Sequence, residues 1–161
     1  MSASTIKAAI VTLLTNNFTG GQDYNGSTLQ NVTNQWLRYI ASTRTPQAVV
    51  RDMSWHEEPL AAGKVNQPVR RRDYQFQVRV VWDGNQDDSD TFDTLIDNIV
   101  EFFALPANIN LQGLADVGSF SQVLAFGLVQ DADKPEPENR GQFIRYACDI
   151  IVAVVEDYEV N

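Results

Sequence analysis

Histidine and cysteine are almost absent from this 161-residue chain, which has one of each, His56 and Cys148. A single cysteine cannot form an internal disulfide, and zinc sites built from several His and Cys ligands are excluded. Nucleophilic catalysis usually borrows a histidine base, and Glu57 and Glu58 could orient His56, but no G-x-S-x-G elbow accompanies it. We therefore expect a surface histidine, a buried and inert Cys148 thiol, and no catalytic residue, metal or cofactor.

Long apolar runs are also missing. No run approaches the ~18 residues that a membrane helix requires. The N-terminal segment has only Lys7 ahead of a short apolar stretch interrupted by Thr and Asn, which is not the pattern of a secretory signal peptide. We therefore expect a soluble protein that is made in the cytoplasm and contacts no membrane.

Positive charge is scarce, with 12 Lys and Arg against 21 Asp and Glu and a formal net charge of −9. Such a balance gives no overall electrostatic help to binding a phosphate backbone, so sequence-reading DNA-binding modules are disfavoured. The 43% of hydrophobic residues can build a substantial core. The length predicts one domain, residues 1–161.

Apolar residues spaced by three and four predict helices. The clearest pattern covers residues 92–103, where Pro106 would end the helix and Asp88 would favour its start. A second covers residues 4–17, with Ser4 as N-cap and Gly20-Gly21 as the stop. A weaker pattern runs over residues 29–42, where the part from 36 to 40 could instead be extended.

Alternating apolar residues predict strands. Residues 74–82 form the clearest one, with Tyr74, Phe76, Val78 and Val80 on its core side. The other predicted strands are residues 48–56, 121–130 and 143–156. Together they indicate an α+β fold, a mostly antiparallel sheet of four or more strands with two or three helices packed on one face. We expect long irregular loops at about residues 57–69 and 131–141.

An acidic segment precedes the clearest helix. Asp83, Asn85 and Asp87 match the first, third and fifth ligand positions of a calcium-binding loop, but Asp88 replaces the required Gly and Thr94 the required Glu. We interpret the segment as an acidic turn that caps the helix. A loose divalent-cation site in residues 83–90 is the alternative.

One basic cluster stands out in this acidic chain, Arg70, Arg71 and Arg72. These arginines could pair with carboxylates of a neighbouring subunit or touch a phosphate backbone. They could equally form a solvated strand entrance that deters edge pairing. The candidate subunit-interface residues are Arg70, Arg71, Arg72, Glu57, Glu58 and Lys64.

The order of these elements resembles that of a known family. An N-terminal amphipathic helix, a hairpin ending in FQVRVVW, a helix SDTFDTLIDNIVEFFALP and a last strand IRYACDIIVAVVEDYEV are similar to the tail terminator proteins of long-tailed bacteriophages, and to related neck and tail-completion proteins. The resemblance implies a virion structural protein, a homohexameric ring at the head-proximal end of the tail tube. Such a ring stops tube polymerisation and takes part in head-tail joining.

The resemblance also implies partners and a location. The ring would bind the tail tube protein and a neck or connector protein, and it would be assembled in the host cytoplasm into the virion. DNA would only pass through its lumen, without sequence-specific binding, and no catalytic residues come with the family.

Three alternatives stay open. The first is another head-tail connector or neck protein. The second is a small metal-dependent enzyme using Asp83, Asp87 and Asp88 with the single histidine. The third is a monomeric adaptor that binds a peptide along an unpaired edge of residues 48–56.

Overall fold

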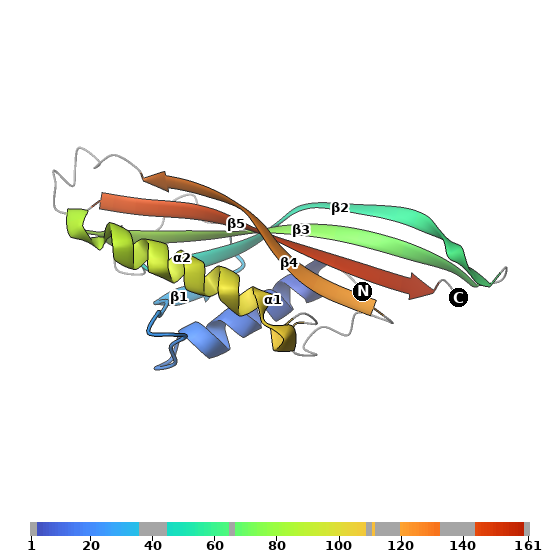
Figure 1. Ribbon diagram of the computed structural model, residues 1–161, viewed down its shortest axis with the longest axis horizontal. Coiled ribbons are helices and arrows are strands. Elements are labelled where there is room, and N and C mark those ends of the chain that lie inside the picture. Colours follow the sequence, from blue (N-terminus) through green and yellow to red (C-terminus); the bar gives the residue numbers. More distant parts are fainter. Residues whose placement is uncertain are drawn as a thin grey trace.

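The computed structural model describes residues 3–35, 45–64, 67–108, 111, 120–132 and 144–159. It is an α+β fold, as predicted: a five-stranded mixed sheet with two long helices on one face (Figure 1). The elements in chain order are α1 (Ala3–Phe18), β1 (Asn31–Thr33), β2 (Gln47–Lys64), β3 (Gln67–Gly84), η2 (Gln86–Asp88), α2 (Ser89–Ala104), η3 (Pro106–Asn108), β4 (Phe120–Ala132) and β5 (Ile144–Glu159).

The sheet has the strand order β1-β2-β3-β5-β4, and only β1 and β2 pair in parallel. The four predicted strands are confirmed. The helix predicted over residues 29–42 is wrong where the structure describes it, because Asn31–Thr33 pairs with the start of β2 instead. The backbone N–H of Gln30 donates to the carbonyl of Pro46 (2.7 Å), so strand pairing outcompetes the weak helix propensity of Asn and Thr. Residues 36–44 lie outside the described residues.

Both strongly periodic helices are confirmed. Helix α1 begins at Ala3, so Ser4 lies inside its first turn and is not the N-cap that we predicted. It ends before Gly20 and Gly21, whose φ angles of 67° and 86° suit glycine. Helix α2 begins after Asp88 and ends before Pro106, as predicted.

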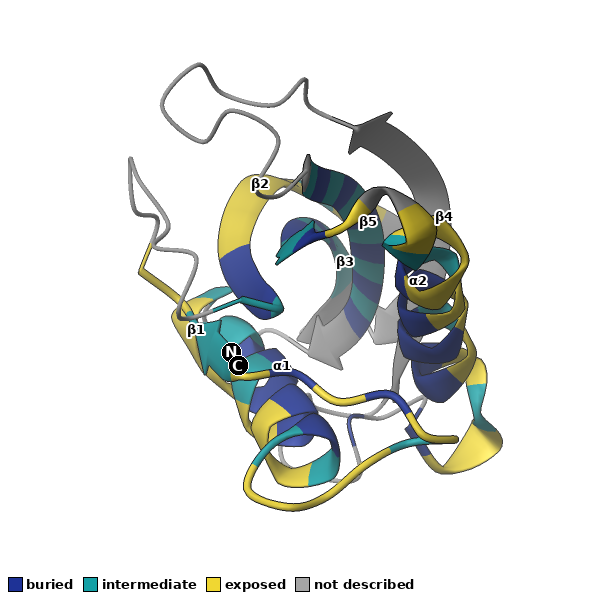
Figure 2. Ribbon diagram, turned by 90° about the vertical axis from the view of Figure 1, so that its left-hand side faces the viewer, coloured by how far each residue is buried: buried dark blue, intermediate teal, exposed yellow. Residues whose placement is uncertain are grey.

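The core lies between the helices and one face of the sheet (Figure 2). Strand alternation puts Tyr74, Phe76, Val78 and Val80 on this face, where all four are buried. The helices contribute apolar stripes at helical spacing, in α1 Ile6, Ala9, Ile10, Leu13, Leu14 and Phe18, and in α2 Phe92, Leu95, Ile96, Ile99, Phe102 and Phe103.

The prediction of an irregular loop at residues 57–69 is wrong. Strand β2 continues to Lys64 and β3 starts at Gln67, so residues 57–64 and 67–69 belong to the two paired strands of a long hairpin. Shifts of register next to Asp52 and Pro59 let the ladder absorb an extra residue and the proline without ending. In Figure 1 this hairpin, together with the end of β5, extends past both helices. Of the other predicted loop, residues 131–132 belong to β4 and the rest lies outside the described residues.

Candidate functional site

The acidic segment of residues 83–90 has a structural role. Arg145 donates two hydrogen bonds to Asp83, from Nε to Oδ1 (2.8 Å) and from Nη2 to Oδ2 (2.9 Å). The Asp83 side chain is 2% exposed, so its charge is neutralised inside the protein. The carboxylate of Asp88 accepts the backbone N–H of Asn85 (2.6 Å), while Asp87 is exposed. Two of the three proposed metal ligands therefore already have protein partners.

The other groups considered for chemistry lie elsewhere. His56 lies on β2 with its side chain 70% exposed and 4.0 Å from Glu58, which confirms a surface histidine. Cys148 is buried in β5, as predicted, and burial raises the pKa of its thiol to about 11. Within the described part of the chain, no three His, Cys, Asp or Glu side chains come close enough together to hold a metal ion.

The sheet face away from the helices carries a polar ladder. Arg79 donates to both carboxylate oxygens of Asp149 (2.7 and 2.9 Å), and Arg51 donates to Gln77 (2.7 Å). Burial by itself would raise the pKa of Asp149. Hydrogen bonds from Arg79 and Gln77 and the charges of Arg79 and Arg51 outweigh it, so the pKa is lowered.

The first candidate surface lies on the hairpin, where α1 stops covering the sheet. Lys7 of α1 reaches Asp52 of β2 (3.5 Å), and Trp55 follows on the same face, because it pairs directly with the buried Tyr74. Trp55 is 59% exposed, and the guanidinium of Arg72 lies 5.6 Å from its ring centre. We call Trp55, Arg72 and Glu57 the arm surface.

The predicted interface residues gather around this surface. Glu57 and Arg72 pair in register and form an ion pair of 3.3 Å within the chain. Glu58 lies opposite Arg71, and Arg70 lies opposite Pro59. Lys64 lies at the end of β2. The six candidates therefore share one hairpin, and their contact with another subunit stays a prediction.

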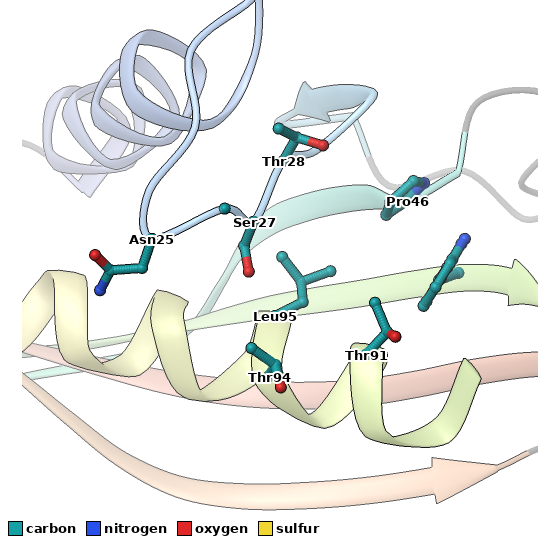
Figure 3. Close-up of a pocket in the computed structure, with 9 residues that line it drawn as sticks. Asn25, Ser27, Thr28, Pro46, Thr91, Thr94 and Leu95 are labelled. Carbon is teal, nitrogen blue, oxygen red and sulfur yellow. The ribbon is translucent and has the colours of Figure 1, made fainter. Parts of the chain in front are cut away.

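The second candidate surface is a pocket of about 290 Å³ at the other end of the helix layer (Figure 3). One wall is the turn Tyr24-Asn25-Gly26-Ser27, closed by backbone hydrogen bonds of 3.0 Å in both directions. Asn25 and Gly26 have φ angles of 51° and 83°, which an Asn-Gly pair adopts readily in a tight turn. Asn98 of α2 donates to the Ser27 hydroxyl (2.7 Å) and fixes this wall on the helix.

The remaining walls come from α2 and the sheet. Thr91 and Leu95 project from α2 toward the turn, and Pro46 lies on the far side (Figure 3). Thr94 and Trp82 also line the pocket. Trp82 is held by Phe92 and Tyr146, with ring centres 6.5 and 6.4 Å away. We call this site the helix pocket; it is lined by Asn25, Gly26, Ser27, Thr28, Pro46, Trp82, Thr91, Thr94 and Leu95.

The lining of the helix pocket suits binding. It has an apolar floor and four hydroxyl groups, and no lining residue carries a charged or titratable group near neutral pH. A hydroxyl without a neighbouring base is a poor nucleophile. The helix pocket can therefore hold an apolar group with a polar rim.

Sequence reasoning missed Trp55, Asn98 and the helix pocket. A tryptophan among charged residues, WHEE, was a usable signal for the arm surface. Asn98, polar within the apolar stripe of α2, was a signal for a buried hydrogen bond. The pocket joins residues 25–28, 46, 82 and 91–95, and no local pattern connects those segments.

No family model and no curated protein matches the chain. Among the helices in the described ranges, none combines the length and apolar character needed to cross a membrane.

Proposed function

We propose that this chain is a bacteriophage virion structural protein, a tail terminator. Its copies form a hexameric ring at the head-proximal end of the tail tube, stop tube polymerisation and join the tail to the neck or head. The observation that carries this proposal is the β2–β3 hairpin, which extends past the helices (Figure 1). Trp55 of this hairpin is exposed, and its pairing with the buried Tyr74 places it on the helix side of the sheet.

The hairpin supports assembly because ordering it costs an isolated subunit conformational entropy. Each ordered residue loses about 1 to 2 kcal/mol of backbone entropy, which only buried surface can offset. Trp55 and Met53 are the exposed large apolar side chains among the described ones, and both lie on this hairpin. An extended ribbon with exposed apolar groups gains the missing burial from a neighbour.

Charge fits the same role. The net charge of −9 disfavours adhesion to DNA, so an acidic lumen would let DNA pass without sequence-specific binding. The partners would be further copies of the chain, the tail tube protein and a neck or connector protein.

Two alternatives differ in their support. The same hairpin suits another head-tail connector or neck protein, which would be found on heads and not on tail tubes. A metal-dependent enzyme has less support, because the Asp83 carboxylate is bound to Arg145 and Asp88 accepts a backbone N–H.

The test is a subunit with a shortened hairpin. Replacing residues 56–73 by Asn-Gly together with Trp55→Ser removes the arm surface, keeps position 55 opposite the buried Tyr74 and leaves the helix-covered core intact. We expect the full-length protein to form rings and to cap its cognate tail tubes in electron micrographs. The shortened protein should fold, shown by circular dichroism, and leave the tubes uncapped.

Two results would overturn the proposal. In the first, the full-length protein forms no ring and caps no tube. In the second, the shortened protein gives tails of normal length that are joined to heads.

A further inference from the structure

The arm surface and the helix pocket are complementary features at different places on one chain. Trp55 projects 59% exposed from the hairpin, so it does not occupy the pocket of its own subunit. We propose that Trp55 of one copy inserts into the helix pocket of the next copy. This inference rests on the proposed ring and names the contact that would build it.

The helix pocket suits one large side chain. Its volume of about 290 Å³ is at the small end of ligand pockets. Pro46, Trp82 and Leu95 offer apolar and aromatic surface to an indole ring, and the hydroxyls at the rim can accept its N–H. The Asn-Gly turn and the Asn98 hydrogen bond hold the wall in place, so little order has to be gained on binding.

Trp55 has the features of an interface anchor. Tryptophan and arginine are among the residues enriched at binding hot spots. Here the Arg72 guanidinium lies over the Trp55 indole, and Glu57 forms an ion pair with Arg72. These contacts restrict the orientation of Trp55 before it meets a partner.

Charge favours the same pairing. Residues 47–73, which include β2 and the first part of β3, carry five basic and four acidic side chains, whereas residues 83–101 carry seven acidic and no basic ones. Asp87 and Asp90 precede Thr91 and Thr94 by one helical turn, and Asp97 follows Thr94 by three residues. The helix pocket is therefore bordered by carboxylates that the arginine-rich hairpin would meet.

The edge of β2 is a weaker docking site than the arm surface. The bulge at Met53 interrupts the edge of β2, and so does Pro59. Bulges and prolines of this kind protect natural sheets from edge-to-edge pairing. The contact between Trp55 and the helix pocket uses two different patches, so it is heterologous and can close into a ring.

Four single variants test the contact by the mass of the protein in solution. Trp55→Ser removes the anchor and Thr94→Phe fills the helix pocket. His56→Ser is the matched control, since His56 follows Trp55 on the same strand, has a side chain that is 70% exposed and lies on the opposite face of the sheet. Ser89→Phe is the control for the helix, because it adds the same side chain at an exposed position of α2 outside the pocket. We expect Trp55→Ser and Thr94→Phe each to weaken self-association at least about 30-fold, and both controls to retain it.

Mixing the two defective variants gives the decisive result. A Thr94→Phe chain still has its tryptophan and a Trp55→Ser chain still has its pocket, so the mixture can form one interface per pair. We expect a one-to-one heterodimer from the mixture and monomers from each variant alone. A misfolded variant would not rescue its partner.

The outcomes separate the two proposals. If the wild type assembles and Trp55→Ser assembles equally well, the Trp55 contact is wrong and the ring still stands. If the wild type stays monomeric up to high concentration and on cognate tail tubes, both fail. Absence of the heterodimer when both single variants are monomeric also overturns the Trp55 contact.

Discussion

Arg145 on β5 and Asp83 on β3 face each other in register and share two parallel hydrogen bonds of 2.8 and 2.9 Å. The pair closes the end of the sheet from which α2 departs. Tyr146, the next residue, donates its hydroxyl to the carbonyl of Asn85 (2.6 Å) and ties the acidic turn to β5. The turn that resembles a cation loop in sequence is thus held by an arginine and a tyrosine.

We predict that Asp83→Ala destabilises the protein by about 3 kcal/mol, because it leaves a largely buried arginine without its partner. The control Asp87→Ala, at an exposed carboxylate of the same turn, should change the free energy of unfolding by no more than about 0.5 kcal/mol. Urea unfolding measures both. Equal effects of the two substitutions would contradict a structural role for Asp83.

Phe103 is fully buried in the main core, on the sheet side of α2. Its replacement by alanine leaves a cavity, and we expect the free energy of unfolding to fall by about 3 to 5 kcal/mol. The exposed Asp97 on the same helix is the control, and Asp97→Ala should have little effect. A Phe103→Ala protein that melts like the wild type would show that the helix face is assigned wrongly.

Cys148 should be unreactive in the folded protein. With its pKa raised to about 11 by burial, only about one thiol in a thousand is ionised at pH 8, and a thiol reagent also has no access to it. We expect no labelling by a chromogenic disulfide reagent in native buffer and one equivalent in denaturant. Ser89→Cys, which adds an exposed thiol, should show rapid labelling of one equivalent in native buffer.

Acid should remove the contribution of Asp149 to the stability of the fold. Its pKa is lowered in the folded state, so the pairing with Arg79 stabilises the fold above the ordinary carboxylate pKa and is lost as the pH falls through the lowered value. We therefore expect the stability difference between the wild type and Asp149→Asn to be largest near pH 7 and to shrink below about pH 4. Urea midpoints across this range measure it. A difference that stays constant with pH would contradict the pairing.

Periodicity predicted most of the fold. The stripe that includes Leu95, Ile99 and Phe103 and the alternation from Tyr74 to Val80 each place many side chains on one side, so local spacing already identifies the buried face. The helix prediction for residues 29–42 was wrong because Asn31–Thr33 forms a strand that pairs with β2. No local pattern in the sequence indicates this contact. The loop prediction for the outer hairpin was wrong because Pro59 and Gly63 are residue types that favour loops. The ladder between β2 and β3 continues past them by a register shift.

The sequence by itself determined the two helices, the four long strands and the side of β3 that is buried, because each depends on the spacing of neighbouring residues. Only the tertiary structure decided where Trp55 points. Strict alternation from Ala48 and Val50 would have turned Ser54 and His56 toward the helices and Trp55 away from them. The extra residue Met53 in the ladder between β2 and β3 reverses the alternation, so Trp55 pairs with Tyr74 and stands on the helix side. A bulge is fixed by the register of the partner strand, and that register exists only once the sheet has formed.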